Sequence, residues 1–197
     1  MTAAEKREAE LLARLVRAVG LDSSRIAEYP RRYRLGQLQR MQRQTVVGAV
    51  LFRYTSVDEV LACVIASDFF EPSRSFPEHW RAKRFKAFNY FVLDQLYLAQ
   101  KLRLVQYLHP VPRKLASTIM ALNDLRNALG HSLFPENRKQ KPQWAGKLIF
   151  EVEAIEAFDA DTQEVIDWFW RAGLVDQWHG SRKPAGPAKH TDRSAPR

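Results

Sequence analysis

The chain has 197 residues, 46% hydrophobic and 27% charged, which is the composition of a folded protein rather than a disordered one. Its length suits one domain, with or without a tail. Lys and Arg number 31 against 22 Asp and Glu, and the formal net charge of +9 favours polyanionic partners such as RNA, DNA or anionic membrane. The single cysteine, Cys63, excludes an internal disulfide framework and a cysteine-based zinc site, and it fits a reduced, cytoplasmic protein.

No segment of the sequence is typical of a targeting signal or a membrane span. The first twenty residues carry charges throughout and lack the apolar core of a signal peptide. Charged residues interrupt every apolar stretch before it reaches the roughly 20 residues that a spanning helix needs. We therefore expect a cytoplasmic protein that does not associate with membranes.

The N-terminal third of the sequence predicts three helices. Residues 3–19 have an apolar stripe at helical spacing. The stretch 29–57 contains six arginines and no acidic residue, and residues 35–53 within it are compatible with a helix. Ser56, followed by Glu59 three residues later, has the pattern of a capping box and predicts that a separate helix begins there.

The middle of the chain predicts two longer helices and a strand. Residues from about 78 to 108 are rich in aromatics, with a basic first third, and we expect one long helix there. Pro110 and Pro112 open the next helix, which is expected to run to Gly130. Residues 147–152 are the one plausible strand.

The C-terminal part predicts one more helix and a tail. Asp159 or Asp161 is expected to cap a helix that ends near Arg171. Beyond it, residues 179–197 are rich in Pro, Ala, Lys and Ser, and we expect a disordered basic tail there.

Together these elements predict an all-α protein, an antiparallel bundle of five to six helices with at most one short β-element near 147–152. A single helical domain would span residues 1–178. Within it, the N-terminal helix occupies 3–19 and the bundle core about 35–175.

The helix that ends at Gly130 carries the most informative polar residue. Its apolar stripe, at alternating spacings of four and three, consists of Leu115, Ile119, Leu122 and Leu129. The same spacing places position 126 on that inward stripe, and the residue there is Arg126. A guanidinium on an inward face is costly unless it is paired or functional, so Arg126 is a candidate site residue.

Asn127 and His131 follow Arg126 and complete a set that can cleave RNA without a metal. A neutral His131 could accept the proton of a ribose 2′-OH, and a second, protonated His131 could serve the leaving 5′-oxygen. Arg126 would donate to the phosphate as charge develops, and Asn127 would orient the imidazole or a phosphate oxygen. The products would be a 2′,3′-cyclic phosphate and a 5′-hydroxyl.

Two arrangements could bring these side chains together. On an unbroken helix, positions 126 and 131 lie about 140° apart and do not converge on one phosphate. Either Gly130 adopts a left-handed conformation and turns the chain back, or a twofold dimer brings two copies of Arg126 and His131 into one cleft.

The run Arg126-Asn127-Ala128-Leu129-Gly130-His131 resembles the RN-x-x-x-H signature of HEPN-domain proteins. Those proteins are small helical domains, often dimeric, and many are metal-independent ribonucleases of toxin–antitoxin, phage-defence or RNA-processing systems. The likeness covers the run LNDLRNALGHSLFPENR around the motif, and the helical layout extends it to roughly residues 30–175.

The resemblance implies that Arg126 and His131 are catalytic and that Asn127 positions the substrate. It implies a metal-independent endoribonuclease with no cofactor that acts as a homodimer on RNA, as a toxin or phage-defence effector, with an antitoxin or other protein as a further partner. The candidate RNA contacts are basic residues of the aromatic-rich stretch and of the loop after His131. They are Arg81, Lys83, Arg84, Arg138, Lys139 and Lys141.

Each site residue also has a structural interpretation. Arg126 could form a buried ion pair, with Asp124 of another chain or with Glu136. His131 could be a helix C-terminal residue favoured by the dipole, and Asn127 could make only local hydrogen bonds. The alternative function is therefore a non-catalytic helical regulator, similar to the mannitol operon repressor family, or a module that binds a partner protein.

Basic and aromatic residues outside the motif have two interpretations as well. The arginines of residues 31–43 are expected to form a solvated face, with an RNA-binding groove as the alternative. The aromatic side chains of residues 80–97 are expected in the core, with base stacking as the alternative. Cys63 lies in an apolar run and is expected to be inert.

Overall fold

The computed structural model of the chain describes residues 2–19, 30–70, 81–130 and 141–175. These residues form six α-helices, one short 3-10 helix and a two-stranded antiparallel sheet. The elements are α1 (Ala3–Val19), α2 (Arg31–Phe69), α4 (Lys83–Phe91), η2 (Leu93–Gln95), α5 (Leu98–Leu108), α6 (Arg113–Gly130), β1 (Gln143–Trp144), β2 (Lys147–Leu148) and α7 (Val152–Arg171). The predicted all-α bundle with one short β-element is confirmed.

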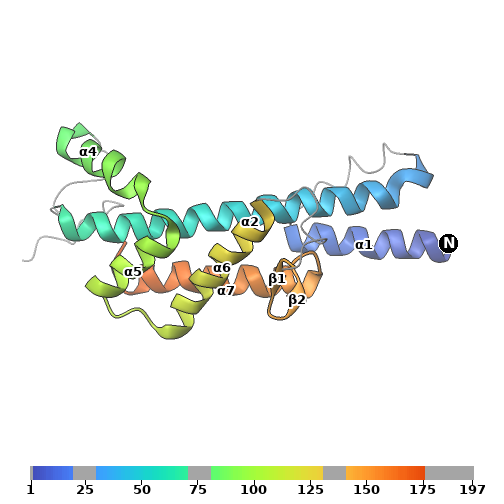
Figure 1. Cartoon of the computed structure of the whole chain (residues 1–197). Helices are drawn as coiled ribbons and strands as arrows, with labels where there is room; N and C mark the ends of the chain where they lie inside the picture. Colours follow the sequence, from blue (N-terminus) through green and yellow to red (C-terminus); the bar gives the residue numbers. More distant parts are fainter. Residues whose placement is uncertain (1, 20–29, 71–80, 131–140, 176–197) are drawn as a thin grey trace, which may run out of the picture.

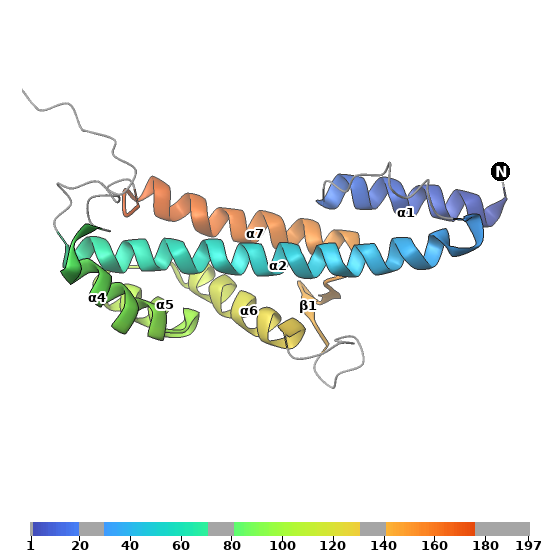
Figure 2. The ribbon, with the colours of Figure 1, turned by 90° about the horizontal axis from the view of Figure 1, so that it is seen from above.

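The 39-residue helix α2 is the axis of the molecule and runs along its whole length (Figure 1). Seen from above, α1 and α7 lie along one side of α2, and α4, α5 and α6 lie along the other (Figure 2). Two polar contacts show that α7 runs in the same direction as α2, so this pair departs from the antiparallel arrangement expected from the sequence. Gln42 donates to the Phe150 carbonyl at 2.6 Å, and further along both elements Arg53 donates to Asp159 at 3.0 Å.

The core lies where α2 meets α5, α6 and α7. Each helix contributes apolar side chains at helical spacing that are less than a tenth exposed. The largest fully buried ones include Leu61 and Ile65 of α2, Ile119 of α6, and Phe158 and Phe169 of α7. This core fixes α6 against the middle of α2, which positions the residues described below.

Two predicted helix boundaries in the first half are wrong. No helix begins at Ser56, because the Ser56 hydroxyl donates to the Phe52 carbonyl at 3.0 Å inside the continuous helix α2 instead of capping a new one. The single helix expected over 78–108 is interrupted after α4 by η2. Tyr97 is extended and its N–H donates to the Gln100 side chain at 2.9 Å, which starts α5 afresh.

The expected strand over 147–152 is shorter and pairs in a hairpin. Trp144 pairs with Lys147 across a two-residue turn, Ala145-Gly146, in which both residues have positive φ, 48° and 78°. Positive φ at both central residues is the geometry of the turn that suits the twist of paired strands. The glycine in this loop was the one sequence signal for the hairpin.

Helix α7 begins at Val152, about two turns or more before the predicted caps Asp159 and Asp161. Asp161 is not a cap, because its carboxylate accepts the indole N–H of Trp144 at 2.9 Å and so fastens the hairpin to the helix. The helix ends at Arg171, as predicted. The predicted tail, residues 179–197, lies outside the described residues.

The described part of the chain contains no helix whose length and apolar character would let it cross a membrane.

Candidate functional site at the end of α6

Arg126 lies at the border of the buried face of α6 rather than on it. The buried residues of this helix are Leu115, Ala116, Ile119, Leu122, Leu125 and Leu129. The inward position expected for residue 126 is therefore taken by Leu125. At 100° per residue, one step along the helix carries Arg126 to the edge of the stripe, where it is half-buried. The prediction that Arg126 stands on the inward stripe is wrong.

The guanidinium of Arg126 is held by an aromatic ring and an amide. Its central carbon lies 5.4 Å from the ring centroid of Tyr54, a residue of α2. Its Nη1 donates to Oδ1 of Asn127 at 3.2 Å. Among the described residues no carboxylate lies within 4.0 Å of it, and neither Nε nor Nη2 has an acceptor there. Arg126 thus keeps several donors for a ligand.

Asn127 is exposed and contacts Arg126 instead of an imidazole in the described structure. Its side-chain oxygen accepts a hydrogen bond from the guanidinium, which restricts the rotation of the Arg126 head group. Asn127 therefore positions the Arg126 guanidinium. The sequence offered two interpretations, that Asn127 positions the substrate and that it makes only local hydrogen bonds, and the observed contact is local but holds a candidate site residue.

Behind Arg126 of α6 lies a polar cluster formed by Tyr54 and Asp58 of α2 and Lys101 of α5. Burial raises the pKa of Tyr54; the Asp58 carboxylate adds to that, whereas Arg126 and a hydrogen bond with the Leu98 backbone oppose it. Asp58 accepts a hydrogen bond from the Lys101 ammonium at 2.6 Å. The phenol is neutral at physiological pH, and an inter-helix ion pair fixes its surroundings.

Sequence reasoning missed this cluster. Tyr54 and Asp58 are one turn apart on α2, which is a weak signal, and nothing in their spacing predicts that Arg126 packs against them. Only the packing of α5 and α6 on the middle of α2 brings the residues together. The buried Lys101, 5% exposed, carries no sequence signal either.

Gly130, the last residue of α6, does not turn the chain back through a left-handed conformation. Among the described glycines only Gly146 and Gly173 have positive φ. The left-handed Gly130 expected from the sequence is therefore wrong, because glycine permits that conformation without requiring it. A Cβ built on Gly130 would lie 3.9 Å from Nη1 of Arg126, so the last residue of α6 lies beside the guanidinium. His131 itself lies outside the described residues.

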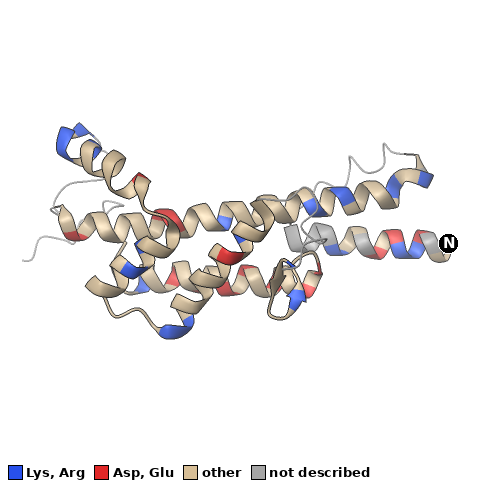
Figure 3. Cartoon of the chain, in the orientation of Figure 1, with Lys and Arg blue, Asp and Glu red and all other residues tan. Residues whose placement is uncertain are grey.

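The predicted RNA contacts divide into two groups. Arg81, Lys83 and Arg84 are exposed at the start of α4 and form the blue group at that end in Figure 3. Lys141 is exposed just before β1. Both views place α4 away from the end of α6 (Figures 1 and 2). The two remaining residues, Arg138 and Lys139, lie outside the described residues.

The arginine-rich stretch is a mixture of solvated and structural residues. Arg40 and Arg43 are exposed, as expected for a solvated face. Arg53 is structural: it joins α2 to α7 by donating to Asp159 and, at 2.7 Å, to Gln163. Arg53, which lies beyond residues 31–43, thus does not extend a basic surface along α2, whereas the exposure of Arg40 and Arg43 agrees with the solvated face expected for residues 31–43.

Cys63 matches its predicted inertness. Burial raises the pKa of its thiol to about 11, and the nearby Glu59 carboxylate acts in the same direction. A thiol of that pKa is almost entirely protonated at neutral pH, which makes it a poor nucleophile.

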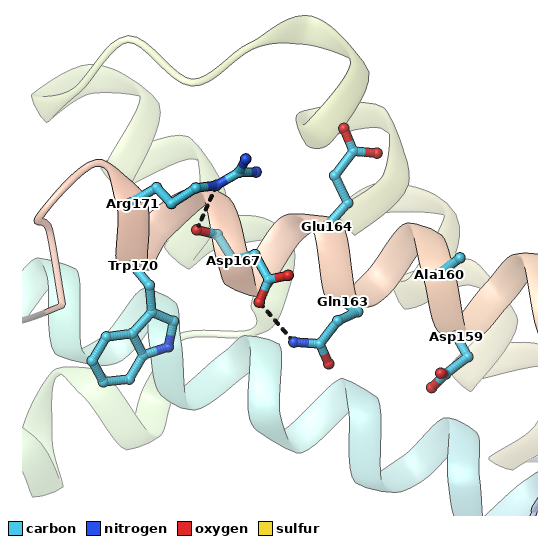
Figure 4. A pocket seen from close by; sticks show the side chains of 7 residues that line it. All are labelled: Asp159, Ala160, Gln163, Glu164, Asp167, Trp170 and Arg171. Carbon is cyan, nitrogen blue, oxygen red and sulfur yellow. Dashed lines mark hydrogen bonds between the residues drawn. The ribbon is translucent and has the colours of Figure 1, made fainter.

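A groove of about 520 Å³ runs along the outer side of α7, and its lining residues all come from that helix (Figure 4). Its carboxylates are already engaged. Asp159 pairs with Arg53, Glu164 with Lys114, and Asp167 accepts from Gln163 at 2.8 Å. The negative charge of the groove would repel a polyanion, and its carboxylates are engaged by other side chains instead of being free for acid–base chemistry. The end of α6 is therefore the better candidate site.

Within the described ranges, no group of three or more His, Cys, Asp or Glu side chains is placed to hold a metal ion. Comparison with protein-family models, with curated proteins and with solved structures finds no match to this chain.

Proposed function

We propose that the chain is a metal-independent endoribonuclease in which Arg126 and His131 are the catalytic residues. One observation carries the proposal. The Arg126 guanidinium is half-buried, has no carboxylate partner among the described residues, and is held in place by Tyr54 and Asn127. A fixed arginine with unused donors is suited to a phosphate, which accepts two parallel hydrogen bonds from one guanidinium.

The chemistry needs a base, an acid and a cation. Neutral His131 takes the proton of the ribose 2′-OH, and the oxygen attacks phosphorus while the bond to the 5′-oxygen breaks. A second, protonated His131 gives its proton to the leaving oxygen. Arg126 stabilises the charge that builds on the phosphate oxygens in the transition state. The products are a 2′,3′-cyclic phosphate and a 5′-hydroxyl.

A homodimer supplies the second imidazole, and one surface of α2 supports this part of the proposal. Leu51, one turn before Tyr54, is 41% exposed and lies about 60° from it around the helix. Phe52, 68% exposed, and Gly48, whose built Cβ meets nothing within 4 Å, continue this open surface around α2 away from Tyr54. Docking of a second chain on this surface would cover Phe52 and Leu51 and reach the border of the Arg126 site at Leu51.

In the cell, such an activity fits a toxin or phage-defence effector restrained by a partner protein. Expression of the active protein should then arrest growth, and the Arg126→Ala variant should not. Growth arrest by the inactive variant would contradict the role as a nuclease effector.

The direct test is cleavage of RNA by the purified protein in EDTA. Arg126→Ala and His131→Ala should each slow cleavage by about 100-fold or more, the usual contribution of such groups. Arg126→Lys keeps the charge but loses the bidentate geometry, so it should retain a small part of the rate. Arg103→Ala, at an exposed position of α5, is the matched control and should cleave normally.

A protein that cleaves none of the RNAs tested, yet binds nucleic acid equally well with His131→Ala, would contradict the proposal. That result would favour the non-catalytic regulator. Circular dichroism of each variant separates loss of activity from loss of folding.

A further inference from the structure

Helix α4 is anchored on one side by aromatic rings. Phe85 and Phe88 face the body of the molecule, and each lies 5.2 Å, ring centroid to ring centroid, from Phe70 at the end of α2. Phe88 also lies 5.4 Å from Phe69. Phe85 and Phe88 are therefore used for packing, which fixes the helix as a projecting arm at one end of the molecule (Figure 1).

The opposite side of α4 is exposed, basic and aromatic. Tyr90 is 63% and Phe91 71% exposed, which contradicts the expectation that the aromatics of residues 80–97 belong to the core. Lys83 and Lys86 are exposed on the same side, and α4 contains no acidic residue. The core prediction failed for Tyr90 and Phe91 because Phe85 and Phe88 fill the side of α4 that packs on the end of α2.

Cationic and aromatic side chains alternate around this outer surface. At 100° per residue, Lys86, Tyr90, Lys83 and Phe91 occupy one arc of about 140° in that order. Arg84 lies at the edge of this arc, with its guanidinium 5.8 Å from the ring centroid of Phe70. Helices that lie on membranes instead separate an apolar face from a basic face. Interleaved cations and rings are the arrangement that single-stranded nucleic acid requires, with phosphates beside the cations and bases on the rings.

We propose that the outer surface of α4 is a binding site for single-stranded RNA. Lys83, Arg84 and Lys86 contact phosphates, and exposed bases stack on Tyr90 and Phe91. The two rings lie edge to face, 4.9 Å apart between centroids, so they offer two differently oriented platforms. Paired bases of a duplex cannot reach such platforms, which gives the preference for single strands.

The α4 site is separate from Arg126 and specifies single-stranded RNA as the substrate class of the proposed nuclease. The choice of RNA over other polyanions rests on that proposed function. Strand capture on α4 would hold an unpaired segment on the protein while another part of the same strand reaches the end of α6. Cleavage and binding can therefore be tested separately.

The test measures fluorescence anisotropy of the full-length protein with a labelled 2′-O-methyl RNA of about 12 nucleotides, within the range of single-strand site sizes. This probe has no free 2′-OH and cannot be cleaved by the proposed chemistry. The double variant Tyr90→Leu/Phe91→Leu should weaken binding by about fivefold or more, as expected for lost stacking. Tyr107→Leu, which removes an exposed aromatic of α5, is the matched control and should bind normally.

Charge variants test the phosphate contacts. Lys83→Gln/Lys86→Gln should lower the slope of log affinity against log salt by about 1.4, because each phosphate contact with a single strand contributes about 0.7. Lys147→Gln, at an exposed lysine of the hairpin, should leave the slope unchanged. Absence of cleavage with this pattern of binding intact would contradict the proposed function and leave the α4 site standing.

Four results would overturn the proposal. The first is equal binding by Tyr90→Leu/Phe91→Leu. The second is equal affinity for a duplex of the same length. The third is loss of binding to phosphatidylserine vesicles in that variant with RNA binding intact, which would assign α4 to a membrane surface. The fourth is a change in sedimentation mass with RNA binding intact, which would make α4 an interface between copies of the chain.

Discussion

The ion pair between Asp58 and Lys101 should be the most sensitive polar contact of the fold. The Lys101 side chain is 6% exposed and its Nζ lies 2.6 Å from Asp58, whose side chain is 27% exposed. The pair joins α2 to α5 directly behind Tyr54. Breaking a buried pair by removing one partner typically costs about 3–5 kcal/mol, because the remaining charge is left without a partner.

The two single variants should differ. Lys101→Met leaves the carboxylate, which water reaches, so we expect a loss of about 2 kcal/mol in the free energy of unfolding. Asp58→Ala leaves a nearly inaccessible ammonium, so we expect about 3 kcal/mol or more. The double variant should lose less than the sum of the two, with a coupling energy of about 1–3 kcal/mol.

Chemical denaturation of the four proteins, monitored by circular dichroism, measures this cycle. Additive losses, within about 0.5 kcal/mol, would refute the reasoning, because they would mean that the two side chains do not interact in solution. The reverse order of the single variants would refute the burial argument while leaving the contact intact.

Three further changes test local features of the structure. Ala145→Gly should raise the free energy of unfolding by about 0.5–1 kcal/mol, because Ala145 has a positive φ of 48°; a loss on denaturant titration would contradict that turn. Gly130→Ala should leave the melting temperature unchanged or higher, since Gly130 is not left-handed and its Cβ would make only ordinary contact with Arg126; a fall of several degrees would show the opposite. Cys63 should react with Ellman's reagent at pH 8 about 100-fold more slowly in the native than in the unfolded protein, because its pKa is raised to about 11. Since the unfolded thiol ionises first, stability should fall as the pH rises from about 9 to 11, and Cys63→Ala should lack that part of the fall.

Much of the fold follows from periodicity in the sequence. The bounds of α1 and the end of α6 agree with prediction, because both helices have a clear apolar stripe and a glycine near their end. The long helix α2 was divided in error at Ser56. A capping pattern does not start a new helix when the serine hydroxyl can instead donate to a carbonyl of the preceding turn, as Ser56 does, and the flanking apolar residues stay in the core.

The start of α7 and the exposed rings of α4 could not be predicted for a different reason. Each depends on which surface of a helix packs against another element. The local sequence of the helix does not determine that packing. Asp161 has the residue type of a helix cap, but its carboxylate accepts a hydrogen bond from Trp144 of the hairpin, a contact that the sequence does not predict. Tyr90 and Phe91 look like core residues until Phe85 is seen to occupy the inner side of α4.

The candidate site was predictable in part. Arg126 and Asn127 were identified by their types and spacing, whereas Tyr54, which holds the guanidinium, comes from a distant helix. The predicted apolar stripe of α6 had a 4-3-4-3 spacing and so placed residue 126 inward. The observed stripe has a 4-3-3-4 spacing and places Leu125 there instead.

The most direct measurement of the central proposal is the chemistry of the RNA ends that the protein produces in EDTA. Mass spectrometry of the products should show 2′,3′-cyclic phosphate and 5′-hydroxyl termini. A 2′-deoxy nucleotide at the cut position should block cleavage there, and Arg126→Ala should abolish the products that Arg103→Ala still forms. Products with 3′-hydroxyl and 5′-phosphate ends, or normal cleavage by Arg126→Ala, would contradict the proposal.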